Sequence, residues 1–207
     1  MLLYAITSRN LLPGTDLERR AALIQYARGW ARAGVDYIQI REKDLSPSQL
    51  LELSRRVVAV VREENSNTRV LVNGPAEIAC AAGADGVHLP SSVPPGAGEE
   101  ARQAIRSAGR EAIVSRACHS LEEIRAAGES SLIVFAPVFE KAGEDENRPG
   151  VGLAMLSQAC RAAHPVPVIA LGGVTAANAS ECVDAGAGGV GGIRLFLGDE
   201  WRRLHSL

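Results

Sequence analysis

The sequence of 207 residues lacks several features that would assign a protein to a class at once. No apolar run approaches the roughly 18 residues that a membrane-spanning helix requires. The four cysteines are far apart and form no CxxC pair, so neither a zinc site nor a disulfide framework is expected. Aromatic residues make up only 4% of the chain, whereas 21 residues are glycine. This composition is typical of an aliphatic, turn-rich α/β protein.

The chain also lacks an excess of charge of either sign. Lys and Arg number 22 and Asp and Glu 24, which gives a formal net charge of −2. Nucleic-acid binding needs a clustered excess of basic groups, so we expect no nucleic-acid partner. The N-terminal stretch MLLYAITSRN has neither the basic start nor the longer apolar run of a signal peptide. Together with the free thiols, this favours a cytoplasmic protein without a membrane partner.

What the chain does contain is an alternation of short β-branched runs with longer amphipathic stretches. Eight runs have strand character: residues 2–8, 37–41, 69–74, 86–89, 112–118, 131–136, 167–173 and 189–193. Strands that alternate with helices favour a parallel sheet, and the count of eight favours closure over an open sheet. We therefore predict a (β/α)₈ TIM barrel that forms a single domain over residues 1–207.

Helix signals lie between these runs. Apolar residues recur at spacings of three and four within residues 16–34. Ser120 with Glu123 three residues later forms a capping-box pattern. Thr175 is predicted to cap a helix that ends at Gly186.

Three segments repeat one phrase, in which a helix end and a turn glycine lead into a new strand: ARAGVDYI (31–38), CAAGADGV (80–87) and VDAGAGGV (183–190). The phrases either reflect the repetition of a barrel or only the common preference of helix-to-strand turns for Ala, Gly and Asp. The loop over residues 137–150, PVFEKAGEDENRPG, is longer than an ordinary connection. We expect it to act as a lid.

The end of the second predicted strand carries polar side chains that face one way. In TIM barrels the chemistry is located at the C-terminal ends of the strands. Gln39, Arg41 and Lys43 alternate along this strand, so all three point to the same side. An unpaired buried amide costs about 1–3 kcal/mol, so the three groups suggest a polar or anionic ligand. Alternatively, Arg41 pairs with a carboxylate of the barrel and Lys43 is solvated.

Two further strand ends carry candidate side chains. Asn73 ends the third strand; its amide can hold a ring or a phosphate, although Asn-Gly-Pro is also a turn signal. His119 follows the fifth strand, three residues after Arg116, and an imidazole there can exchange protons near neutral pH. The alternative is an ordinary loop histidine beside the helix cap. Of the other histidines, we interpret His88 as a hydrogen-bonded core residue and His164 and His205 as surface residues.

Paired glycines follow the seventh strand and lie within the eighth, and they are the strongest physical signal in the sequence. Many TIM barrels hold phosphate with the loops after these two strands and a short helix N-terminus. The residues at these positions are Gly172, Gly173, Gly191 and Gly192, followed by Arg194. Glycine lets backbone N–H groups approach an anion closely, and an arginine can bind it in a bidentate manner. The alternatives are tight turns and a solvated arginine.

With these residues assigned, the chain resembles the thiamine phosphate synthase/TenI superfamily along nearly its whole length. The matching segments are, in order, YAIT, YIQIREK, LVNG, GADGVHLP, CHSLEEI, FAPVF, PGVGL and PVIALGGV. The resemblance implies a (β/α)₈ barrel that acts on the thiazole and pyrimidine phosphates of thiamine biosynthesis. One branch joins hydroxymethylpyrimidine pyrophosphate to a thiazole phosphate carboxylate. The TenI branch includes thiazole tautomerases, which aromatise that carboxylate by moving a proton and need no metal.

Departures from the synthase pattern favour the TenI branch. The two aspartates that hold Mg²⁺ in typical synthases fall at Gly74 and Val93, and neither side chain can ligate a cation. The serine that synthases carry before the histidine falls at Ala117, and EKAGE (140–144) replaces their phosphate-binding segment. Gln39 and Lys43 remain closer to the synthase pattern.

The resemblance therefore implies, first, a thiazole tautomerase with His119 as general acid/base and no cofactor or metal. The second reading is a thiamine-phosphate synthase, which would require Mg²⁺ and for which Glu77 is the only nearby substitute ligand. The third is a non-catalytic regulator that binds thiazole phosphates and acts through a protein partner. In each case the ligand is a phosphorylated heterocycle, and a homodimer is one expected assembly because two-fold dimers are the commonest.

Overall fold

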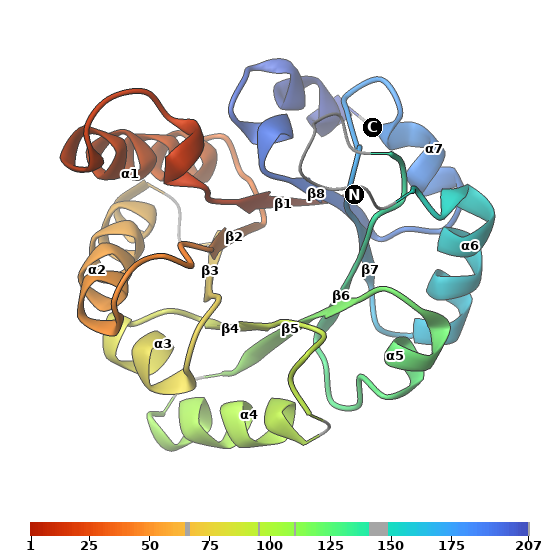
Figure 1. Cartoon of the computed structure of the whole chain (residues 1–207), viewed down its shortest axis with the longest axis horizontal. Coiled ribbons are helices and arrows are strands. Elements are labelled where there is room, and N and C mark those ends of the chain that lie inside the picture. Colours follow the sequence, from red (N-terminus) through yellow and green to blue (C-terminus); the bar gives the residue numbers. More distant parts are fainter. Residues whose placement is uncertain (65–66, 95, 110, 141–148, 207) are drawn as a thin grey trace.

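The computed structural model describes residues 1–64, 67–94, 96–109, 111–140 and 149–206. Eight parallel strands close into a barrel in the order of the sequence, and the last strand pairs with the first (Figure 1). The strands are β1 (Leu2–Ile6), β2 (Tyr37–Ile40), β3 (Arg69–Val72), β4 (Gly86–Leu89), β5 (Ile113–Cys118), β6 (Leu132–Phe135), β7 (Val168–Ala170) and β8 (Gly189–Gly192). The predicted fold is confirmed.

Helices surround the barrel, as Figure 1 shows. They are α1 (Asp16–Arg32), α2 (Pro47–Glu64), α3 (Ala76–Ala82), α4 (Ala97–Ser107), α5 (Leu121–Arg125), α6 (Gly152–Ala163) and α7 (Ala179–Asp184). A short 3₁₀ helix, η1 (Arg9–Leu11), follows β1, and two more, η2 (Arg194–Phe196) and η3 (Glu200–Ser206), follow β8 in place of an eighth α-helix. No helix within the described ranges has the length and apolar character needed to cross a membrane.

Alternation along the strands divides the buried side chains into two sets. The outward set packs under the helices and includes Leu3, Ile38, Val114 and Ile133. The inward set fills the barrel with Tyr4, Ile6, Leu71, Leu132, Val134 and Ile169. Every strand thus contributes to one layer or the other, as period-2 geometry requires.

The three repeated phrases mark real helix-to-strand turns. Gly34, Gly83 and Gly186 have φ values of +81°, +80° and +101°, a left-handed conformation that favours glycine. In the first two phrases an aspartate follows at the second position after the glycine. Asp36 accepts a hydrogen bond from the backbone N–H of Leu3 and Asp85 one from Val70, both at 2.7 Å. The turns therefore also brace the first residues of neighbouring strands.

The helix signals were partly right. The helix predicted over residues 16–34 is α1, and the helix that ends at Gly186 is α7. Thr175 does not cap α7, which begins at Ala179 with Asn178 as its N-cap residue. The Thr175 hydroxyl instead accepts a hydrogen bond from the Asn178 N–H in the turn that precedes the helix.

The lid predicted over residues 137–150 falls largely on residues 141–148, which lie outside the described residues. Its described ends run along the loop after β7. The N–H of Val138 donates to the Leu171 carbonyl and that of Phe139 to the Gly172 carbonyl. The first residues after β6 are therefore fixed against the end of β7.

Candidate active site

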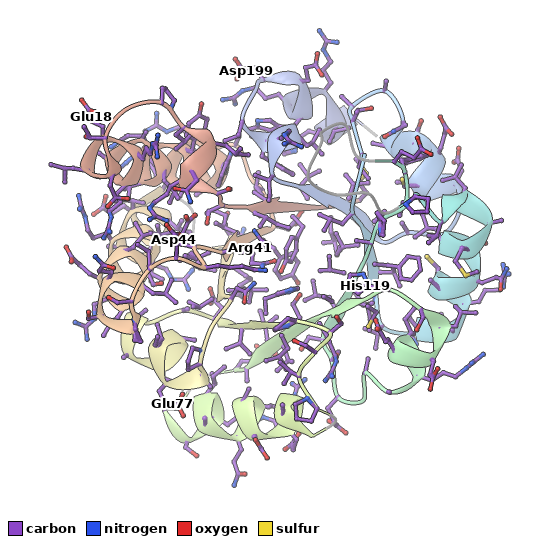
Figure 2. All side chains as sticks on the ribbon, in the orientation of Figure 1. Glu18, Arg41, Asp44, Glu77, His119 and Asp199 are labelled. Carbon is purple, nitrogen blue, oxygen red and sulfur yellow. The ribbon has the colours of Figure 1, made fainter. Side chains whose placement is uncertain are left out.

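Four of the predicted site residues follow the C-terminal ends of their strands, so the parallel barrel brings them to one end, the mouth. Arg41 and Lys43 follow β2, Asn73 follows β3 and His119 follows β5. Figure 2 shows Arg41 and His119 inside the ring of helices, whereas Glu77 lies outside the barrel. Common placement at one end is what a shared site requires.

A polar network lies inside the barrel below this mouth. The Tyr4 hydroxyl donates to Gln39 Oε1 at 3.0 Å and lies 3.1 Å from Ser115 Oγ. His88 Nδ1 lies 2.9 Å from the same Ser115 hydroxyl. Gln39 is thus a partnered interior residue, and His88 is the hydrogen-bonded core histidine that the sequence predicts. The sequence analysis missed Tyr4 and Ser115, although both are polar residues at inward positions of otherwise apolar strands.

Arg41 faces this interior network. Burial and, secondarily, the positive charge of Arg41 lower the pKa of His88 to about 3. No carboxylate among the described residues pairs with the Arg41 guanidinium or with the Lys43 amine, and Lys43 is exposed. Of the two readings of Arg41, the pairing with a barrel carboxylate is therefore not found within the described part of the chain. Two cations remain available at the end of β2.

The carboxylate between these cations points elsewhere. Glu42 is buried and accepts hydrogen bonds from the Thr7 hydroxyl at 2.6 Å and from Arg9 Nη1 at 3.0 Å. Arg9 is a buried arginine that the sequence analysis did not identify, because it lies 33 residues from Glu42. Burying an ion pair of this kind is tolerated when further hydrogen bonds satisfy its members.

His119 is held by two backbone contacts. Its N–H donates to the Glu123 carboxylate at 2.5 Å, and its ring Nδ1 lies 2.6 Å from the Ala136 carbonyl oxygen. A carbonyl oxygen can only accept, so Nδ1 carries the proton, and Nε2 is the nitrogen that can take up another. The predicted capping box is half formed, because Ser120 accepts from the Glu123 N–H while the Glu123 carboxylate binds the N–H of His119 instead.

The paired glycines after β7 have a structural reason in this fold. Gly172 and Gly173 have φ values of +89° and +64°, and a Cβ at Gly173 would come within 2.5 Å of the Glu140 carbonyl oxygen. At the β8 end, Gly191 is buried against Tyr4 inside the barrel, and Gly192 is half-buried at the mouth. Exposed Arg194 begins the short helix η2 that follows. Phosphate binding by these residues stays a prediction.

Two predicted substrate contacts differ in their surroundings. Asn73 is half-buried, and its backbone N–H donates to the Ile40 carbonyl at 2.9 Å. Arg116 alternates with inward Ser115, so it lies on the outer side of β5, where its guanidinium donates to the Val93 carbonyl. This contact braces the loop after β4, and a substrate contact for Arg116 stays a prediction.

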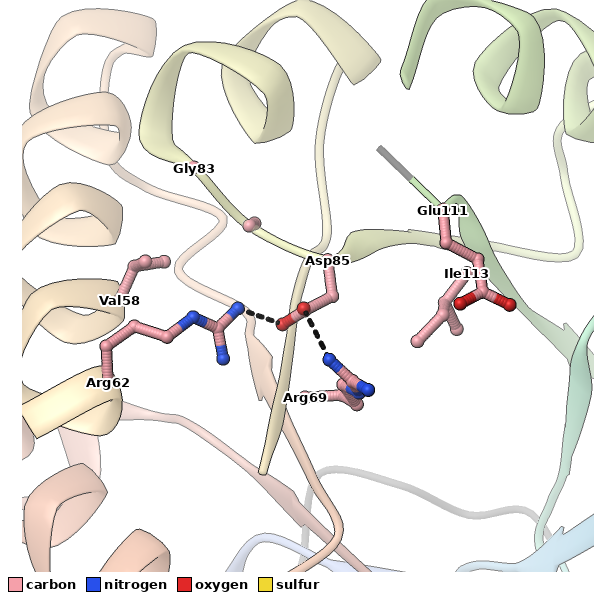
Figure 3. A pocket seen from close by; sticks show the side chains of 8 residues that line it. Val58, Arg62, Arg69, Gly83, Asp85, Glu111 and Ile113 are labelled. Atoms are coloured by element: carbon pink, nitrogen blue, oxygen red, sulfur yellow. Dashed lines mark hydrogen bonds and ion pairs between the residues drawn. The ribbon is translucent and has the colours of Figure 1, made fainter. Parts of the chain in front are cut away.

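A separate cavity of about 440 Å³ lies at the opposite end of the barrel, near the first residues of β3 and β5. Figure 3 shows that Asp85 binds both of its arginines, Arg62 at 2.7 Å and Arg69 at 3.4 Å. Because its cations are paired and it faces away from the mouth, this cavity is not part of the candidate site.

A comparison with known protein families identifies the family of this chain. A family model described as thiamine monophosphate synthase matches residues 3–196. The chain belongs to this family. The resemblance inferred from the sequence motifs is thereby confirmed, and the protein is a member of an enzyme family of thiamine biosynthesis.

Relatives of this family match over most of the chain. A putative thiamine-phosphate synthase of Geobacter sulfurreducens is 36% identical, with 95% of this chain and 87% of the relative covered. A thiamine-phosphate synthase of Methanoculleus marisnigri is 35% identical, with 95% and 88% covered. The structure of thiamine phosphate pyrophosphorylase from Pyrococcus furiosus has a TM-score of 0.77 at 24% identity and covers 99% of this chain and 94% of its own. This last likeness concerns the fold.

Magnesium, which the synthase branch of the family uses, does not fit the described residues. They contain no group of three His, Cys, Asp or Glu side chains that could hold a metal ion. Glu77, the one substitute ligand that the sequence offered, is exposed on α3. Val93 contributes only its carbonyl, to Arg116, and a Cβ at Gly74 would lie 3.1 Å from Leu50. We therefore derive no step through a metal.

Proposed function

We propose that this protein is a thiamine-phosphate synthase, which transfers a pyrimidine group from its pyrophosphate ester to a thiazole phosphate. The curated relatives carry this name at 31–36% identity over 84–96% of the chain. The observation that supports it in the structure is the pair of cations, Arg41 and Lys43, which no described carboxylate neutralises. This reading ranks above the tautomerase that the sequence motifs alone favoured.

The chemistry follows from where charge develops. In the transfer, the carbon–oxygen bond to pyrophosphate breaks, the leaving group takes the electron pair, and a thiazole ring nitrogen forms the new bond to carbon. Cations fixed beside the leaving group stabilise it more as its charge grows, and this difference lowers the barrier. Arg41, held above the interior network, and Lys43, at the rim, are the groups we assign to this task. Gly192 and the start of η2 are assigned to the thiazole phosphate.

The test measures formation of thiamine phosphate from the two precursors by chromatography, over a range of Mg²⁺ concentrations. We expect Arg41→Met to lower kcat/KM by about 10²-fold, the usual effect of removing one preorganised charge-stabilising group. Arg28→Met is the control, because Arg28 binds Glu63 and Glu64 on α2 away from the mouth. No product from the unaltered protein under any of these conditions would reject the proposal.

A second candidate function, thiazole tautomerisation, is favoured by the geometry of His119. With Nδ1 donating to Ala136, Nε2 can accept a proton from a substrate carbon and return it to another position, and the reaction needs no metal. We expect His119→Ala to lower the rate of aromatisation by about 10²–10⁴-fold, followed by NMR of the thiazole phosphate carboxylate. Undiminished turnover would remove His119 from the mechanism. Binding of the thiazole phosphate without turnover in either assay would support the regulator reading.

A further inference from the structure

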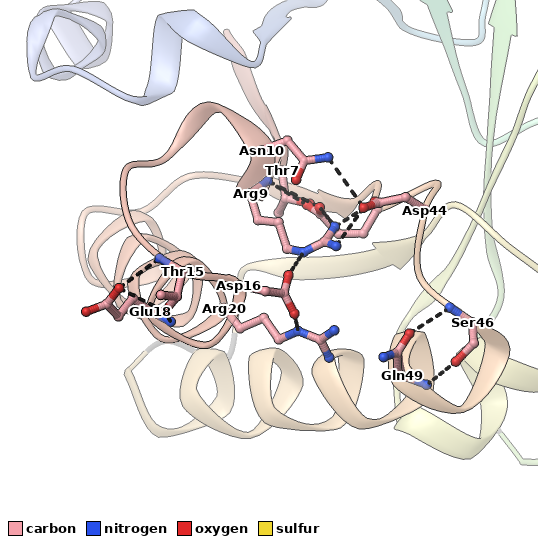
Figure 4. Close-up of polar contacts among 11 residues, drawn as sticks. Thr7, Arg9, Asn10, Thr15, Asp16, Glu18, Arg20, Asp44, Ser46 and Gln49 are labelled. Atoms are coloured by element: carbon pink, nitrogen blue, oxygen red, sulfur yellow. Dashed lines mark hydrogen bonds and ion pairs between the residues drawn. The ribbon is translucent and has the colours of Figure 1, made fainter.

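Arg9 lies at the centre of a cluster of acidic groups beside the mouth. Its guanidinium donates to Asp16 Oδ1 at 2.8 Å through Nε and to both oxygens of Asp44 at 2.6 and 2.7 Å through Nη1 and Nη2 (Figure 4). Nη1 also donates to Glu42 Oε2 at 3.0 Å. The Arg9 side chain is only 5% exposed, and three carboxylates share its single charge.

Glu42 connects this cluster to the candidate site. Its side chain is 2% exposed, and it accepts hydrogen bonds from the Thr7 hydroxyl and from the backbone N–H of Arg9. The Thr7 hydroxyl oxygen in turn accepts the backbone N–H of Arg41 at 2.9 Å. Glu42, which lies between Arg41 and Lys43 in the sequence, is therefore a buried carboxylate linked to the Arg41 backbone by two hydrogen bonds through the Thr7 hydroxyl.

A buried carboxylate in this position needs a cation. Charges attract several times more strongly in a partly buried site than in water, so an unpaired Glu42 would draw Arg41 or Lys43 to itself. That cation would then no longer be available to bind an anionic ligand. Arg9, in η1 after the C-terminal end of β1, donates to Glu42 and so supplies the cation that this carboxylate needs.

We propose that Arg9 is a positioning residue that neutralises Glu42, so that Arg41 and Lys43 keep their charge for an anionic substrate. The identity of that anion, a pyrophosphate group, rests on the proposed synthase function. Arg9 itself need not contact the substrate.

The first experiment measures binding of inorganic pyrophosphate by isothermal titration calorimetry. Arg9→Met is expected to weaken binding by about tenfold or more, because unpaired Glu42 competes for the cations. The double variant Arg9→Met/Glu42→Gln removes that competitor and is expected to bind within about threefold of the unaltered protein. Arg28→Met, which also removes an arginine shared by two carboxylates, is the matched control and leaves binding unchanged.

A merely structural role for Arg9 would not give this rescue. The proposal would be overturned if Arg9→Met bound pyrophosphate as tightly as the unaltered protein, or if adding Glu42→Gln did not restore the affinity that Arg9→Met had lost. If Arg9→Met fails to fold by circular dichroism, Arg9→Lys takes its place. Lysine loses the bidentate bond to Asp44 but keeps a positive charge beside Glu42, which is the part of Arg9 that the proposal requires. Affinity is therefore expected to stay within about threefold, and a tenfold loss would overturn the proposal.

A second readout does not depend on the proposed function. The Nε–Hε signal of Arg41 in ¹H–¹⁵N NMR spectra reports which group the guanidinium engages. We expect this signal to shift in Arg9→Met, to return in the double variant and to stay unchanged in Arg28→Met. If the unaltered protein does not bind pyrophosphate, the synthase proposal fails while this pattern still supports Arg9; an Arg41 signal that never moves overturns the role of Arg9.

Discussion

His88 makes the stability of this barrel depend on pH in a way that can be measured. The side chain is 6% exposed, and its Nδ1 lies 2.9 Å from the Ser115 hydroxyl inside the barrel. Burial, and then the charge of Arg41, lower the pKa of His88 from 6.5 to about 3. In the unfolded chain the imidazole returns to its ordinary value, so between these two pKa values only the unfolded state binds the proton.

The sign and size of the effect follow by linkage. Because the folded-state pKa is lowered, the contribution to stability is fully present above the unfolded pKa and is lost as the pH falls toward the folded pKa. For pKa values of 6.5 and about 3, the free energy of unfolding decreases by about 2 kcal/mol from pH 7 to pH 5 through His88 alone. Over this interval the slope stays below the limit of about 1.4 kcal/mol per pH unit for one proton.

Urea unfolding at about pH 7 and about pH 5, with His88→Asn as the reference, isolates this contribution. The carboxylates titrate alike in both proteins, so their effect cancels. We expect the unaltered protein to lose about 2 kcal/mol more than the variant between the two pH values. The reasoning would be refuted if both proteins lost the same free energy of unfolding between the two pH values. An NMR titration of the His88 ring with its midpoint near the ordinary pKa of histidine would also refute it.

Two further predictions concern the interior and the loop after β7. Tyr4→Phe leaves Gln39 Oε1 without its donor inside the barrel, so we expect a loss of about 1–3 kcal/mol in the free energy of unfolding, measured in urea; an unchanged midpoint and slope would contradict it. Gly173→Ala forces a side chain into a left-handed position against the Glu140 carbonyl, and we expect it to lower the free energy of unfolding by about 1–3 kcal/mol, again measured in urea. Gly198→Ala, where a Cβ would meet no atom within 4 Å, is the control and is expected to leave the free energy of unfolding unchanged.

The fold could be predicted because its signals are local and repeated. Each strand was found from its apolar period, and the structure differs mainly at the C-terminal ends. The strand predicted over 69–74 ends at Val72, and that over 167–173 ends at Ala170. These overruns have one cause, since the residues that continue the pattern past the strand are the ones that form the mouth. Periodicity alone does not distinguish the last strand residue from the first loop residue.

The site could be predicted only in part, because much of it depends on partners distant in sequence. The position of His119 at the end of β5 follows from the sequence, but its hydrogen bond to Ala136, which assigns the proton to Nδ1, does not. YIQIREK shows that Arg41 and Glu42 are adjacent, but no spacing rule indicates that Arg9 engages Glu42 across 33 residues. The contact of Arg116 with the Val93 carbonyl, 23 residues away, cannot be inferred from the sequence either.

The two candidate reactions make different electrostatic demands on this mouth, and salt separates them. A pyrophosphate transfer depends on attraction between a multiply charged substrate and cations at the rim, where Lys43 is exposed. Salt screens such attraction, because the Debye length falls from about 10 Å at 0.1 M to about 3 Å at 1 M. Tautomerisation by His119 takes one proton from the substrate and returns it, so substrate and product carry the same charge and no multiply charged leaving group forms.

We therefore expect kcat/KM for thiamine phosphate formation to fall by about tenfold or more between roughly 0.1 and 1 M NaCl, with kcat changing less than about twofold. Arg41→Met should flatten this dependence, whereas Arg28→Met should leave it as it is, because Arg28 is paired on the helical surface. A salt series with the same slope in Arg41→Met and in the unaltered protein would mean that the guanidinium does not face the charge of the substrate. The cations would then have to be reassigned to the interior network, where Arg41 already acts on His88.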